Sequence, residues 1–171
     1  MKYQKRIGVN RKSISGLKSD DEVGDELTEQ NVNDINITPS IVCSNCGALY
    51  ANGEWTWNAL PNDHIKGVCP SCKRIEDHDP AASVIIKGTY FAGHKDEINH
   101  LVKNISKSEL SDHPLERLMD IKDGASETEF TTTGIHLARR IGYALQLAYD
   151  GELRSVQSDN DHIIVYWEKD L

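Results

Sequence analysis

The chain has 171 residues and a formal net charge of −8, with 38% hydrophobic and 27% charged residues. This length accommodates one medium-sized domain, or a small domain with an appended module. The longest strongly apolar stretch, Ile163 to Trp167, is far shorter than the roughly 20 residues that span a bilayer, so we exclude an integral membrane protein and any membrane partner. Basic residues near the N-terminus have no apolar segment after them, so we expect no secretory signal and a cytoplasmic location.

Residues 1–39 are rich in polar side chains and have no sustained apolar periodicity, so we expect a flexible tail. Residues 1–18 contain no acid, and residues 20–34 contain no base. An acidic protein is a poor general binder of polyanions, because phosphate neutralisation dominates nucleic-acid affinity. Nucleic-acid contact would therefore need the basic part of the tail, unless the tail is only a solubilising extension. The tail residues that we assign to this contact are Lys2, Lys5, Arg6, Arg11 and Lys12.

All four cysteines fall within residues 40–80, as two C-x-x-C pairs. The pairs are Cys43 with Cys46 and Cys69 with Cys72, and 22 residues separate them. Two turns of this kind, on adjacent hairpins, direct four thiolates at one point, which is the tetrahedral arrangement of a structural zinc site. Gly47 after the first pair tolerates the positive φ of a tight turn, and Pro70 fixes φ in the second pair. We therefore predict Zn²⁺ as the cofactor and a zinc ribbon over residues 40–80.

Other uses of four cysteines fit less well. Two disulfides would need an oxidising compartment, and a redox C-x-x-C would stand at a helix start without a matched second pair. A catalytic zinc keeps an open position for water, whereas four cysteines close the coordination shell. An iron–sulfur centre stays open as the alternative, because four thiolates satisfy it too. A zinc ion with four thiolates adds −4 + 2 = −2, which takes the net charge from −8 to about −10.

Aromatic and basic side chains lie between and after the cysteine pairs. The alternation Glu54-Trp55-Thr56-Trp57 predicts a strand with both tryptophans on one face. We expect the two rings to form a small core; stacking on bases is the alternative. Lys73 and Arg74 follow the second pair, where they either offset the anionic centre or contact phosphate. We assign both to nucleic-acid binding.

Residues 81–171 predict a compact α+β unit of β-α-β-β-α-β-β order. Two helices on one face of a mainly antiparallel sheet would bury both apolar helix stripes. The hairpin after the first helix turns at Asp123-Gly124, and the second helix has Thr133 as N-cap and Gly151 as C′ residue. The strands are Ser83–Phe91, Leu118–Lys122, Glu127–Thr133, Leu153–Gln157 and Ile163–Lys169, and the first helix is Gly93–Glu109.

The second helix begins near His136, Arg139 and Arg140 and buries a stripe of mostly apolar residues. A helix N-terminus attracts anions through free N–H groups, so we assign Arg139 and Arg140 to a nucleic-acid contact. The alternative is a capped helix with an exposed basic edge. The stripe consists of Ala138, Ile141, Gly142, Leu145, Ala148 and Tyr149.

The sequence contains no motif typical of catalysis: there is no G-x-S-x-G, no Walker loop, no G-x-G-x-x-G and no H-E-x-x-H. We therefore predict that the protein is not an enzyme.

Four segments together resemble a little-characterised bacterial zinc-ribbon family, which is similar to the zinc-binding region of the archaeal and eukaryotic adaptor for export of the large ribosomal subunit. The resemblance covers residues 41–171 and implies a zinc-dependent protein that docks on ribosomal RNA or a ribosomal protein. Only the four cysteines carry over, as zinc ligands. The segments are Cys43-x-x-Cys46-Gly47, Cys69-Pro-x-Cys72-Lys73, His113-Pro114-Leu115-Glu116-Arg117 and Thr131-Thr132-Thr133-Gly134-Ile135-His136-Leu137-Ala138-Arg139-Arg140-Ile141-Gly142.

Two functional hypotheses follow. The first is a non-enzymatic zinc-binding protein that associates with RNA or the ribosome. The second is a zinc-stabilised protein–protein adaptor without nucleic-acid contact, which the acidic run over residues 20–34 favours because phosphates repel it.

Overall fold

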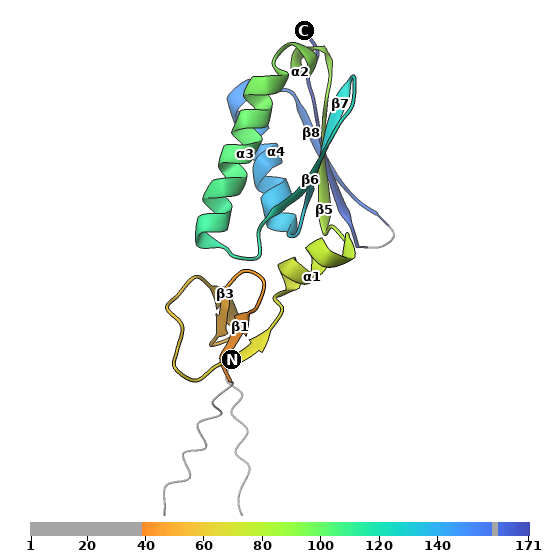
Figure 1. Cartoon of the computed structure of the whole chain (residues 1–171). Helices are drawn as coiled ribbons and strands as arrows, with labels where there is room; N and C mark the ends of the chain where they lie inside the picture. Colours follow the sequence, from red (N-terminus) through yellow and green to blue (C-terminus); the bar gives the residue numbers. More distant parts are fainter. Residues whose placement is uncertain (1–38, 159–160) are drawn as a thin grey trace, which may run out of the picture. The chain divides into compact units, whose positions relative to one another are not determined.

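The computed structural model describes residues 39–158 and 161–171 (Figure 1). The tail predicted over residues 1–39 lies, except for Pro39, outside the described residues. The described part is an α+β fold with four helices and two mainly antiparallel sheets, each containing one parallel pair. The predicted α+β class is therefore confirmed. Within the described ranges, no helix has the length and apolar character needed to cross a membrane.

The smaller sheet has four strands in the order β3-β2-β1-β4. The strands are β1 (Ile41–Cys43), β2 (Leu49–Ala51), β3 (Glu54–Thr56) and β4 (Ile65–Gly67), followed by helix α1 (Pro70–Asp77). β1 pairs antiparallel with β2 and parallel with β4. Asn52 (φ 54°) and Gly53 (φ 91°) turn the chain between β2 and β3, as an Asn-Gly pair favours in a two-residue hairpin loop. Helix α1 was not predicted from the sequence.

The larger sheet has five strands in the order β6-β7-β5-β9-β8, of which only β5 and β9 are parallel. Its strands are β5 (Ala82–Lys87), β6 (Leu118–Asp123), β7 (Glu127–Thr132), β8 (Glu152–Gln157) and β9 (Ile163–Glu168). Helices α2 (Thr89–Gly93) and α3 (Lys95–Asp112) connect β5 to β6, and α4 (Ile135–Tyr149) connects β7 to β8. This order matches the predicted one except for the extra helix α2.

The core of the larger sheet forms because alternate strand residues face the helices. α3 and α4 lie on the same side of the sheet, as Figure 1 shows. Their apolar stripes pack against the strand residues that point to that side. The buried side chains include Val84, Ile86, Phe130, Val165 and Trp167 from the strands, and Ile98, Val102, Leu137, Ala138, Ile141 and Leu145 from the helices. Most of the predicted stripe of α4 is confirmed, but Ala148 is exposed.

The predicted strand Ser83–Phe91 is wrong beyond Lys87. Gly88 has φ +109°, which ends the strand, and helix α2 begins at Thr89. The carboxylate of Asp170 accepts hydrogen bonds from the Thr89 backbone N–H (2.9 Å) and hydroxyl (3.1 Å). A carboxylate 81 residues away thus satisfies a donor at the start of this helix. The next helix starts at Lys95 and extends to Asp112, three residues beyond the predicted end.

The predicted N-cap of the second long helix is also wrong. Gly134 is the N-cap of α4 and provides no side-chain bond. The Glu116 carboxylate accepts instead from the Leu137 backbone N–H (2.8 Å), and the Thr133 hydroxyl donates to the Leu115 carbonyl (2.6 Å). At the other end, Gly151 follows the C-cap with φ +104°, as predicted.

Candidate metal centre

The four cysteine sulfurs converge on one point. All four Sγ atoms lie within 4.8 Å of one another, and the Sγ atoms of Cys46 and Cys69 are 3.7 Å apart. In a tetrahedral site with metal–sulfur bonds of about 2.3 Å, sulfurs would be separated by about 3.8 Å. Cys43, Cys69 and Cys72 are buried, Cys46 is half-buried, and all four are free thiols. The geometry therefore suits one metal ion held by four thiolates.

The first pair stands on a tight turn after β1. The Gly47 N–H donates to the Cys43 carbonyl and the Cys43 N–H donates to the Ala48 carbonyl, both at 2.8 Å. Gly47 has φ +79°, the left-handed conformation that glycine adopts without strain. This turn brings Cys46 back beside Cys43, as the sequence predicted.

The second pair stands at the start of α1. The sequence predicted a hairpin at this position, and that prediction is wrong. Cys69 is the N-cap of α1, and its Sγ accepts a hydrogen bond from the Cys72 N–H at 3.4 Å. Pro70 occupies the first turn of the helix, where its missing N–H costs nothing. The Cys69 N–H donates to Cys43 Sγ at 3.2 Å and so joins the two pairs.

Cys43, Cys69 and Cys72 differ in acidity. Burial raises the pKa of Cys69 and of Cys72, and at Cys72 the neighbouring cysteine thiols raise it further. At Cys43 burial also favours the neutral thiol, but N–H groups of Cys69, Asn45 and Cys46 outweigh it and lower the pKa to about 6. Cys69 and Cys72 must therefore lose protons when a metal binds.

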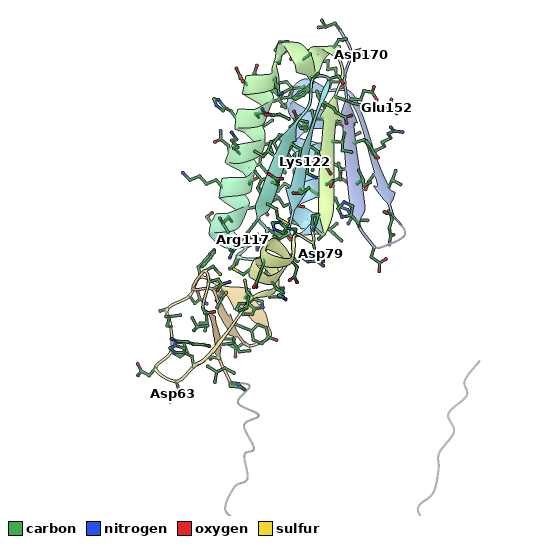
Figure 2. The ribbon with its side chains drawn as sticks, turned by 45° about the vertical axis from the view of Figure 1, so that its right-hand side comes forward. Asp63, Asp79, Arg117, Lys122, Glu152 and Asp170 are labelled. Carbon is green, nitrogen blue, oxygen red and sulfur yellow. The ribbon has the colours of Figure 1, made fainter. Side chains whose placement is uncertain are left out.

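Arg117 lies beside the cysteines. Its Nη1 donates to Cys72 Sγ at 3.5 Å, and its guanidinium carbon lies 5.8 Å from the centre of the Trp57 ring. Figure 2 labels this side chain near helix α1. Burial lowers the pKa of Arg117, but the thiols of Cys46, Cys72 and Cys69 outweigh this effect and the pKa is raised. Arg117 belongs to one of the segments that carry the family resemblance, but no role was predicted for it. A lone basic residue 45 positions from Cys72 gives no spacing signal.

The two tryptophans between the cysteine pairs differ in environment. Trp55 packs against the cysteine cluster, and its ring centroid is 5.4 Å from that of Tyr50. Trp57 lies beyond β3, is 41% exposed, and donates from Nε1 to the Leu110 carbonyl at 2.6 Å. The predicted small core is thus confirmed for Trp55 and wrong for Trp57.

The basic residues assigned to nucleic-acid binding are partly paired with acids. In α1, Lys73 pairs with Asp77 (2.7 Å) and Arg74 with Asp79 (2.9 Å). In α4, Arg140 forms an ion pair with the buried carboxylate of Glu109, and Arg139 is exposed. The Glu116 carboxylate already occupies the first turn of α4, where an anion was expected. The tail residues Lys2, Lys5, Arg6, Arg11 and Lys12 lie outside the described residues.

A pocket of about 580 Å³ opens near the cysteine cluster. It is lined by Trp55 from β3, by His113, Leu115 and Glu116 before β6, and by His136 from α4, among others. Over residues 39–158 and 161–171, only the four cysteines form a group of histidine, cysteine or acidic side chains close enough to hold a metal ion. The histidines of the pocket are therefore not arranged as a second metal site.

The fold and the site together define an α+β protein with a cluster of four cysteines arranged so that they could hold a metal ion. Comparisons with protein-family models, with curated proteins and with solved structures find no match to this chain.

Proposed function

We propose that the protein binds one Zn²⁺ ion through Cys43, Cys46, Cys69 and Cys72, that residues 40–80 form a zinc ribbon, and that the protein is not an enzyme. The convergence of four sulfurs within 4.8 Å is the observation that supports this proposal. Four thiolates fill a tetrahedral shell and leave no position for a substrate or a reactive water, so the metal would serve stability.

Metal analysis of the native protein tests this step. We expect one equivalent of zinc per chain and no visible absorption band from an iron–sulfur centre. The matched variant Cys69→Ser should lose the zinc, whereas Ser44→Ala, in the turn beside the first pair, should retain it. An iron–sulfur spectrum, or full zinc retention by Cys69→Ser, would contradict the proposal.

We propose that the zinc-stabilised fold acts as a protein–protein adaptor. Lys73, Arg74 and Arg140 pair with acids, so these residues offer little charge to phosphate. Three large apolar side chains in the segment between the two cysteine pairs, Leu60, Ile65 and Val68, are 45–52% exposed, which suits a protein surface better than RNA. Protein partners captured from nuclease-treated lysate, and lost after zinc removal, would support the adaptor. Partners that disappear on RNA digestion would contradict it.

Association with RNA or the ribosome is the second candidate, favoured by the basic run over residues 1–18, which contains no acid. It predicts co-sedimentation with ribosomal particles at low salt, because counterion release makes phosphate contacts salt-dependent. Deletion of residues 1–18 should abolish co-sedimentation, whereas deletion of the acidic residues 20–34 should preserve it. Absence from ribosomal fractions at low salt would remove this candidate.

A further inference from the structure

Among the described residues, the charge of Arg117 has no carboxylate partner. The ion pairs among the described residues do not include Arg117. Its Nη2 is buried and has no hydrogen-bond partner among the described residues. A cation withdrawn from water without a counter-charge is costly. Its Nε donates to the Pro114 carbonyl at 2.7 Å and its Nη1 donates to Cys72 Sγ at 3.5 Å, and four thiolates around a divalent ion would carry a net charge of −2.

Residues 113–117, here called the connector, also contact the cysteine cluster through Leu115. The Leu115 side chain packs against the cluster. Its carbonyl accepts a hydrogen bond of 2.6 Å from the hydroxyl of Ser71, which stands between Cys69 and Cys72 in the second pair. Charge and packing thus both tie the connector to the metal site.

The same few residues hold the start of α4. The Thr133 hydroxyl donates to the Leu115 carbonyl and accepts from the Arg117 N–H at 2.9 Å. The carboxylate of Glu116 accepts from the Leu137 N–H and fits so closely against Gly134 that an added Cβ there would collide with it. A displaced connector would therefore leave the first turn of α4 without its cap.

We propose that Arg117 is the counter-cation of the metal centre and that the connector couples metal occupancy to the start of α4. The inference rests on the proposed zinc binding. Zinc should stabilise residues 113–137 as well as the ribbon. Because coupling is reciprocal, a change near α4 should weaken zinc binding.

The first test measures zinc affinity by competition with a chromogenic chelator. Arg117→Met should lower the affinity about 10–100-fold, as is typical for loss of a group that hydrogen-bonds a metal ligand. Arg117→Lys, which keeps the charge without the planar fork, should lose less. The matched control is Arg154→Met, because Arg154 also lies over an aromatic ring (4.7 Å from that of Tyr166) but stands on β8. Parental affinity in Arg117→Met would overturn the inference and leave zinc binding intact.

The second test does not depend on Arg117. Thr133→Val removes the hydroxyl that holds the connector and should lower zinc affinity about fivefold or more. Thr128→Val removes a comparable buried hydroxyl, which donates to Asp123 at 2.8 Å at the other end of β7, and should leave zinc affinity unchanged. In the parent, zinc should slow amide exchange at Leu137. Equal zinc affinity in both variants, or protection confined to residues 40–80, would overturn the coupling.

Discussion

Single residues determine how the four cysteines are positioned and what surrounds them. Cys69 serves both as a prospective ligand and as the N-cap of α1, and Arg117 approaches Cys72 from a segment 45 positions away. The C-x-x-C spacing predicted the cluster because four thiolates in two close pairs have few other uses. It could not predict Arg117, whose role depends on how the connector packs in three dimensions.

Gly47 offers a test at this scale. It has φ +79°, and an added Cβ would meet no atom within 4 Å, so only backbone strain opposes a side chain there. Gly47→Ala should lower the free energy of unfolding by about 1–2 kcal/mol. Gly93→Ala is the matched control, since its Cβ also meets nothing and its φ is not in the left-handed region. Urea unfolding of the zinc-loaded proteins measures both, and equal stability of the two variants would argue against strain at Gly47.

At the scale of whole elements, regular patterns predicted most of the secondary structure. The alternation in β9 and the stripe of α4 were readable because burial imposes periods of two and 3.6 on apolar residues. The wrong predictions concern helix starts that are stabilised by residues distant in the sequence. Asp170 holds the start of α2, and Glu116 caps α4. A local pattern carries no trace of these partners.

The α2 cap should depend on pH. Hydrogen bonds from the Thr89 backbone N–H, and then from its hydroxyl, lower the pKa of Asp170 below its ordinary value of 3.8. A lowered folded-state pKa means that the cap stabilises the protein above the ordinary value and is lost as pH falls through the folded-state pKa. Asp170→Asn should therefore lower the melting temperature at pH 7 and have a much smaller effect near pH 2.

A variant at Thr89 separates the two hydrogen bonds that the Asp170 carboxylate accepts. Thr89→Val keeps the backbone N–H and removes only the hydroxyl, so its effect at pH 7 should be smaller than that of Asp170→Asn. Thermal melts at both pH values measure the difference. A loss that is the same at pH 2 and pH 7 in Asp170→Asn would show that the carboxylate charge is not responsible.

The cap of α4 gives a second prediction for an element. Glu116 places a negative charge at the positive end of the helix dipole and accepts from the Leu137 N–H. Glu116→Gln keeps the shape and removes the charge, and should cost about 0.3–1 kcal/mol of unfolding free energy. Urea unfolding measures this cost, with the exposed Glu54→Gln as control. A Glu116→Gln variant as stable as the control would contradict a charged cap.

For the molecule as a whole, the two sheets differ in what supports them. The larger sheet has a continuous core that includes Trp167, Phe130 and Leu137, whereas the cluster around the cysteines contains few apolar side chains. A core that small needs another source of stability, and a structural zinc supplies on the order of 10 kcal/mol in comparable sites. The sequence predicts a need for a metal here, because so few apolar residues surround the cysteine pairs.

Chelation should therefore act unequally on the two sheets. We expect a strong chelator to unfold residues 40–80 and to lower, without abolishing, the melting transition of residues 81–171. Far-UV circular dichroism and thermal melts follow the two effects, and chelator already saturated with zinc is the control. A single transition unchanged by chelation would mean that no metal contributes to the fold.

The strand order β6-β7-β5-β9-β8 has a consequence for biosynthesis. A nascent chain leaves the ribosome from its N-terminal side, so both cysteine pairs emerge well before β9. β9 lies between β5 and β8, and among the described strands β8 pairs only with β9. The larger sheet must therefore wait, half assembled, until β9 has been translated, while the cysteine pairs are already free to bind a metal.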